Sequence, residues 1–254
     1  MLFRASQPSR RPPPADAEPG HFRLRLSAEE VLVQLRRNPR ARRYTLRVRA
    51  ASRDVVLTIP ARGTLHEAFD FARRHAGWVE TRLARLPEVV AFAPGAVIPL
   101  RGAPHRIVHR PGMRGTVWTG AEEGEPALYV AGDPAHVARR VGDYLRREAR
   151  KDIVAAAHRH AQALGVSIAR VTLRDTASRW GSCSGTGALS FSWRLILAPP
   201  DVLDYLAAHE VAHRREMNHG PRFWATVDGL FPARDAAELW LKKHGPALHR
   251  YGAE

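Results

Sequence analysis

Cysteine is almost absent from this chain of 254 residues, in which Cys183 is the only one. An internal disulfide is therefore excluded, and the composition favours a reducing compartment. The N-terminal segment lacks the apolar run of a secretory signal, and no apolar stretch elsewhere is long enough to cross a bilayer. From these absences we predict a soluble, cytoplasmic protein without a membrane partner.

Acidic residues and lysines are scarce beside arginine. Lysine and arginine together number 40 against 25 acidic residues, so the formal net charge is +15. The densest basic stretch runs from Arg36 to Arg49 and holds seven arginines without an acidic residue. Such a charge attracts polyanions, which makes nucleic acid a candidate partner. The alternative is that an arginine-rich composition only keeps the surface hydrated, since two of these arginines occupy the polar face of an expected strand.

Hydrophobic residues make up 44% of the chain, which is enough for a globular fold with a sizeable core. Residues 1–20 are rich in proline, serine and alanine and predict a disordered tail. Residues 21–132 predict a β-rich N-terminal part, because short strand-like runs alternate with glycine-rich turns. Within it, a capping box at Thr64–Glu67 predicts one helix that ends before Pro87, with Trp78 in the core.

Residues 133–254 predict an α+β domain that begins with a long helix ending at Gly165. His158 and His160 on this helix are expected to be surface or packing residues, because positions two apart do not share a helix face. Strands over 168–173 and 188–197 then predict a hairpin. We expect a helix beginning at residues 199–201 to follow directly, and a last helix to be interrupted at residues 245–246.

The chemistry is expected in residues 209–219. His209, Glu210 and His213 form an H-E-x-x-H motif, and on a helix the two histidines share one face. Two such imidazoles can hold one zinc ion, and the glutamate can act as general base on a zinc-bound water. The histidines also continue an apolar stripe that starts with Val202 and Leu206, which supports a helix over this stretch.

A third zinc ligand is expected after the motif. His219 follows His213 by six residues, the spacing found in metzincins, H-E-x-x-H-x-x-G-x-x-H. The alternative is Glu238, placed as in thermolysin-like enzymes, and we favour His219. Cys183 is expected to pack beside a loop rather than to bind metal.

The metzincin pattern is incomplete in this chain. Glu216 occupies the position of its glycine, and no methionine follows His219 to form a Met-turn. We therefore expect the helix to break later, either at Asn218 or at Gly220–Pro221.

Several of these segments together resemble the YgjP-like metallopeptidase family, which is related to the SprT-like and WLM zinc proteases. The resemblance covers roughly residues 30–248 and rests on the segments Ser178–Ser184, Phe191–Leu195, Tyr205 with His209–His213, and Asn218–Trp224. It implies a zincin-like fold with His209, His213 and His219 as zinc ligands and Glu210 as the catalytic glutamate. SprT-like relatives act on proteins crosslinked to DNA, so by analogy the resemblance adds interest to the positive charge.

We therefore predict a zinc-dependent peptidase that acts on peptides or proteins, with strand 188–197 aligning an extended substrate by strand addition. One alternative is a nucleic-acid-binding protein in which the metal site is secondary, and another is an inactive zinc-bound relative. No residue is assigned to substrate binding, but four side chains are candidates to assist the oxyanion: Arg179, Arg194, Tyr205 and His244.

Overall fold

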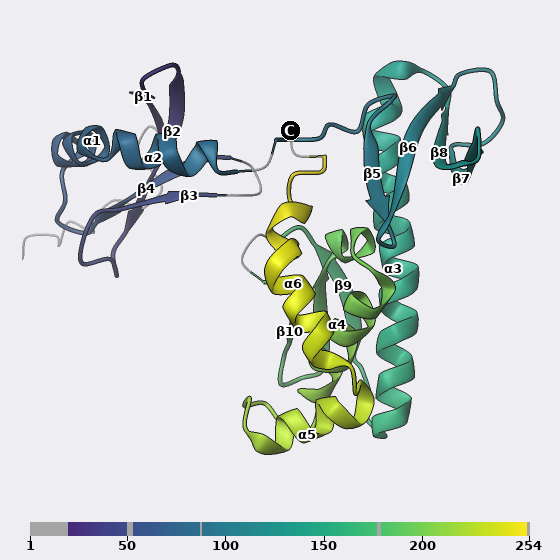
Figure 1. The fold of residues 1–254 in the computed structure, drawn as a ribbon. Coiled ribbons are helices and arrows are strands. Elements are labelled where there is room, and N and C mark those ends of the chain that lie inside the picture. The colour runs from purple at the N-terminus through teal and green to yellow at the C-terminus, as the bar shows by residue number, and fades with distance from the viewer. Residues whose placement is uncertain (1–19, 50–52, 87, 177–178, 253–254) are drawn as a thin grey trace, which may run out of the picture. The chain divides into compact units, whose positions relative to one another are not determined.

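The computed structural model describes residues 20–49, 53–86, 88–176 and 179–252 (Figure 1). These residues form two compact units, an N-terminal unit up to Leu86 and a C-terminal unit after it. The division differs from the boundary expected at residue 132, because the sheet of residues 97–131 shares one core with the long helix that follows it. The tail expected over residues 1–20 lies, except for Gly20, outside the described residues.

The N-terminal unit is a four-stranded sheet packed against two helices (Figure 1). The strand order is β1-β2-β4-β3, with β2 and β4 parallel and the outer pairs antiparallel. The elements are β1 (His21–Arg25), β2 (Glu30–Asn38), β3 (Thr45–Val48), β4 (Val55–Pro60), α1 (Leu65–Arg74) and α2 (Ala76–Ala84).

The capping box is confirmed, because Thr64 accepts a hydrogen bond from the backbone of Glu67 and the Glu67 carboxylate accepts one from the backbone of Thr64. The prediction of a single helix is wrong, since the chain bends at His75, whose ring nitrogen lies 2.8 Å from the carbonyl oxygen of Phe71. The expectation that Trp78 lies in the core is also wrong. Val79 takes the buried position in α2, and Trp78 stays 48% exposed.

The C-terminal unit begins with a second sheet, which packs on the long helix α3 (Val137–Leu164). Its order is β5-β6-β8-β7, from β5 (Val97–Leu100), β6 (Ala103–Arg110), β7 (Val117–Glu122) and β8 (Glu125–Ala131). A 3-10 turn capped by Asp133 leads into α3, which ends at Gly165 with a φ of 69°. The predicted long helix is confirmed. His160 is a packing residue, as expected, and hydrogen-bonds Asp204 at 2.6 Å.

A three-stranded sheet follows, built from β9 (Arg170–Arg174), β10 (Gly181–Cys183) and β11 (Ala188–Ser192). The expected hairpin between the first and last of these is wrong, because they run parallel. The loop between them contributes β10, which pairs antiparallel with β11 on its other side. The strand expected over 188–197 ends at Ser192, since residues 193–197 form a fully buried 3-10 helix, η2 (Trp193–Leu197).

Three helices complete the unit: α4 (Pro200–Ala212), α5 (Pro221–Leu230) and α6 (Arg234–Leu248). Helix α4 is buried along most of its length and contacts α3, α5, α6 and β10. The interruption expected at residues 245–246 is wrong, because α6 continues through Pro246. The fold is thus mixed α and β, with α4 at the centre of the larger core. No helix in the described part of the chain combines the length and apolar character that crossing a membrane requires.

Candidate metal centre

Helix α4 delivers the H-E-x-x-H motif from the centre of the core. It starts with Pro200 in its first turn, as predicted from the sequence, and its last residues carry His209 and Glu210. His213 caps the C-terminal end with an ordinary right-handed conformation. Because His209 and His213 are four residues apart, their rings meet, with centroids separated by 5.2 Å.

After α4 the chain forms a tight turn in which no residue adopts a left-handed conformation. Backbone N–H groups of Arg214 and Arg215 donate to carbonyls three residues earlier, and no residue from 213 to 220 has a positive φ. The break expected at Asn218 or Gly220–Pro221 therefore comes earlier, directly after Ala212. This tight turn shows why a glycine is not needed at Glu216.

His219 lies next to the motif at the end of this turn. Its Nε2 is 3.2 Å from Nε2 of His209, and one nitrogen from each of the three histidines lies within 4.8 Å of the other two. The structure thus brings together the three histidines that the sequence singled out. Glu238 and Cys183 are not part of this group.

The donor set fits a metal ion. Nδ1 of His213 lies 3.1 Å from the backbone carbonyl of Glu216, so Nε2 is left for a ligand. Burial and the neighbouring histidines lower the pKa of His209 to about 4. Burial also lowers the pKa of His213, aided by His219 and opposed by the hydrogen bond to Glu216. Both rings are therefore neutral at neutral pH, and neutral imidazole is the form that binds metal.

An aromatic side chain fixes the three imidazoles. Phe223 of α5 is fully buried, and its ring centroid lies 4.9 Å from that of His209, 4.5 Å from His213 and 4.6 Å from His219. Trp224 adds contacts to His209 and His219. The sequence motif did not indicate a role for these aromatic residues at the site. The signal was the Gly220–Pro221 helix start, which places Phe223 one turn after His219.

Glu210 is buried beside the histidines and faces β10. Burial raises the pKa of its carboxyl group to about 8, although the charge of Arg179 acts in the opposite direction. No described residue donates a hydrogen bond to this carboxylate. A Cβ added at Gly181 would overlap it, so glycine at this position gives the carboxylate its space.

The four side chains considered as candidates to assist the oxyanion differ in their surroundings. Arg194 is excluded, because its buried guanidinium donates to both carboxylate oxygens of Asp175 and to the carbonyls of Leu248 and Tyr251. Tyr205 packs edge-on against His209 at 5.9 Å, and burial raises its pKa to about 12, so it keeps its proton. Arg179 is exposed but interacts electrostatically with Glu210.

His244 is the remaining candidate. It is exposed on α6 and makes a tilted ring contact with Trp240 rather than with the histidine cluster.

An H-E-x-x-H motif on a buried helix, with a third histidine next to it, is the arrangement found in metallopeptidases. The family model of the YgjP-like metallopeptidase domain matches residues 42–244, and the chain belongs to this family. No match was found among curated proteins. Among solved structures, the zymogen of the metallopeptidase abylysin from Pyrococcus abyssi is 20% identical, with 37% of this chain and 92% of that chain covered and a TM-score of 0.33.

Proposed function

We propose that this protein is a zinc-dependent peptidase with a zincin-like catalytic domain over residues 133–254. The observation that carries the proposal is a buried carboxylate, Glu210, next to three imidazoles that can share one metal ion. His209, His213 and His219 would hold zinc through one ring nitrogen each. When bound, zinc lowers the pKa of a water molecule and polarises the substrate carbonyl. The single cysteine is consistent with a cytoplasmic setting.

Glu210 would transfer a proton from the attacking water to the leaving amine. Its carboxyl group is buried beside the histidines, and burial raises its pKa to about 8. The charge of a bound zinc ion would lower that pKa and leave the carboxylate able to accept a proton from the attacking water. Oxygen then bonds to the peptide carbon, and the C–N bond breaks as Glu210 returns the proton to the leaving amine. The same side chain therefore serves as base and then as acid.

An extended substrate would pair with β10. The strand-addition role first expected for residues 188–197 does not fit, because β11 already has a partner on each side. Strand β10 is an edge of its sheet. Ser184 and Trp180 bond to β11, so by alternation the backbone groups of Gly181 and Cys183 face away from it. These outward-facing backbone groups support the addition of a substrate strand next to Glu210.

Three variants test the proposal, with zinc content and cleavage of casein or a peptide as the two measurements. Glu210→Gln is expected to keep zinc and to lose about 10²- to 10⁴-fold in kcat/KM. His219→Ala is expected to lose zinc. Glu238→Ala is the matched control, because this exposed carboxylate lies outside the histidine group, and it should keep both properties. Full activity in zinc-loaded Glu210→Gln would contradict the proposed role of Glu210.

A further inference from the structure

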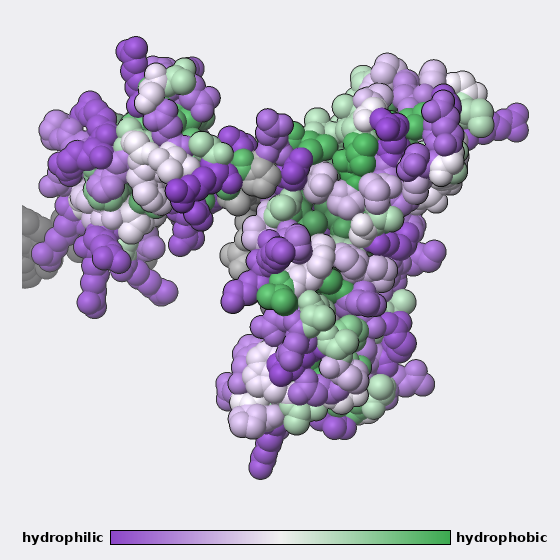
Figure 2. Space-filling model, in the orientation of Figure 1, coloured by the Kyte–Doolittle hydropathy of each residue, from purple (hydrophilic) through white to green (hydrophobic). Residues whose placement is uncertain are grey.

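The positive charge of the chain is concentrated in the N-terminal unit. Residues 20–86 contain fifteen arginines, no lysine and six acidic residues, a net charge of +9. Residues 87–254 are more than twice as many, yet their net charge is only +5. The hydrophilic side chains of the N-terminal unit stand out from its surface in Figure 2. A surface that merely keeps the protein hydrated does not require this unequal distribution.

Most acidic groups of the N-terminal unit are already engaged within it. Glu30 pairs with Arg23, Asp70 pairs with Arg73, and Glu80 accepts a hydrogen bond from Ser27. The Glu67 carboxylate caps α1 and accepts the hydroxyl of Tyr44. Few carboxylates are therefore left to neutralise the remaining arginines.

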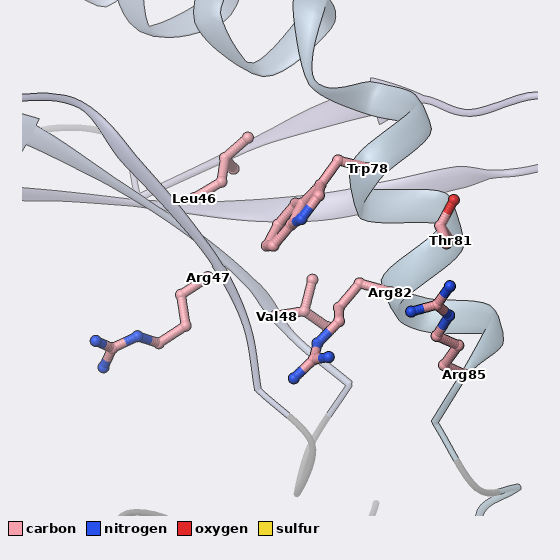
Figure 3. Close-up of a pocket in the computed structure, with 7 residues that line it drawn as sticks. All are labelled: Leu46, Arg47, Val48, Trp78, Thr81, Arg82 and Arg85. Carbon is pink, nitrogen blue, oxygen red and sulfur yellow. The ribbon is translucent and has the colours of Figure 1, made fainter.

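A groove in this unit gathers three of those arginines around an aromatic ring. It has a volume of about 340 Å³ and is lined by Leu46, Arg47, Val48, Trp78, Thr81, Arg82 and Arg85 (Figure 3). Arg47, Arg82 and Arg85 are exposed, and no carboxylate of the described residues lies within ion-pairing distance of them. Their charges are thus available to a ligand.

Secondary structure places the aromatic ring and two of the charges on one surface. Trp78 and Arg82 lie four residues apart on α2, and Arg85, the C-cap of this helix, follows three residues later, so the three share one side of the helix. Arg47 comes from β3, the edge strand of the sheet, and its side chain alternates with those of Leu46 and Val48. Figure 3 shows the indole of Trp78 beside Leu46, and the guanidinium group of Arg47 directed away from this indole. Neither an aromatic ring nor a guanidinium of the described residues stacks on this indole.

The surface beside the groove is also basic. A second hollow of about 480 Å³ adjoins the other end of β3 and has Arg42 and Arg62 among its lining residues. Residues 42 and 43 form a bend and β3 begins at Thr45, so the stretch from Arg42 to Arg47 reaches at most roughly 17 Å. That length suits several nucleotides of an extended strand, since single-strand sites cover about 4–16 nucleotides.

We propose that this basic groove binds single-stranded nucleic acid, with a base stacked on Trp78 and phosphates held by Arg82 and Arg85. Exposed aromatic faces among unpaired arginines are the combination that single strands require, because bases supply π-faces and the backbone supplies charge. A duplex offers no free base face to Trp78. Binding here is independent of the peptidase reaction and does not use the metal centre.

The test is fluorescence anisotropy of labelled oligonucleotides with the full-length protein, at low and then rising salt. Single strands of DNA and RNA of equal length decide which sugar is preferred, and either one supports the proposal. Trp78→Ala should weaken single-strand binding about 5- to 150-fold, whereas Trp78→Phe, which keeps a ring, should stay close to wild type. Duplex of the same length should bind more weakly.

The arginine variants separate a specific groove from general charge. Arg82→Ala should reduce the slope of log K against log[salt] by about 0.7. Arg25→Ala is the matched control, because Arg25 is exposed on β1, at the opposite edge of the sheet, and it should leave the slope unchanged. Circular dichroism checks that the variants remain folded.

Four results would overturn the proposal. One is the absence of single-strand binding at low salt. Another is equal loss in Arg25→Ala and Arg82→Ala, and the third is unchanged affinity in folded Trp78→Ala. Displacement of the oligonucleotide by polyglutamate at equal charge concentration would also count against it, because the groove would then recognise charge without bases.

Discussion

Replacing Gly181 by alanine should displace Glu210, the proposed general base, while leaving the proposed metal ligands untouched. Gly181 opens β10, and a Cβ built on it would lie 2.7 Å from both Cγ and Cδ of Glu210. Those distances are shorter than a van der Waals contact, so one of the two groups must move. The backbone of Gly181 is paired with β11 at Phe191, and the carboxylate is therefore the part expected to turn away.

The size of the effect follows from the overlap. Reaching an ordinary contact of about 3.4 Å requires a displacement of roughly 0.7 Å, and a misplacement of about 1 Å in a catalytic group costs about 10²-fold. We expect kcat/KM of Gly181→Ala to fall roughly 10- to 100-fold. The strain should also lower the free energy of unfolding by about 1–3 kcal/mol.

The assay is peptide cleavage with zinc content measured on the same samples. Zinc stoichiometry should remain that of the wild type, because the three atoms nearest to the added Cβ all belong to Glu210. Gly185→Ala, in the turn of the same hairpin, is the control, since a Cβ there meets no atom within 4 Å. Wild-type kcat/KM in Gly181→Ala would refute the steric reasoning. Loss of zinc together with activity would refute the claim that only Glu210 is displaced.

Three further changes probe the surroundings of the site. Asp175→Asn leaves the buried guanidinium of Arg194 without its carboxylate partner. Chemical denaturation should show that the free energy of unfolding falls by about 3 kcal/mol. Burial raises the pKa of Asp204, but the hydrogen bonds and charges of His160 and Arg159 together outweigh burial and leave the pKa lowered. Wild type should therefore exceed Asp204→Asn in stability above about pH 4, and urea titrations should show this advantage disappearing as pH falls through the native pKa. Phe223→Ala removes the ring that touches all three histidines, so thermal unfolding should show a free energy of unfolding lower by about 3–5 kcal/mol. Isothermal titration should show weaker zinc binding. Unchanged zinc affinity would contradict the positioning role of Phe223.

Local patterns predicted the elements that depend on neighbours in sequence. The capping box at Thr64 and the glycine stop at Gly165 were confirmed, since each needs only hydrogen bonds or a conformation within a few residues. The predictions that were wrong concern features that depend on contacts between residues distant in the sequence. Trp78 was expected in the core, but α2 buries the neighbouring Val79 and leaves Trp78 48% exposed. The strand over 188–197 ends early because the packing of the core buries every residue from 193 to 197.

The sequence by itself determined how His209, Glu210 and His213 are placed, because the period of a single helix arranges them. It also indicated the family, whose model spans residues 42–244. Only the tertiary structure decided that His219 returns to within 3.2 Å of His209, that Phe223 supports all three rings, and that Gly181 faces Glu210. These contacts join segments from different elements, and their formation depends on how a common core is filled rather than on local periodicity.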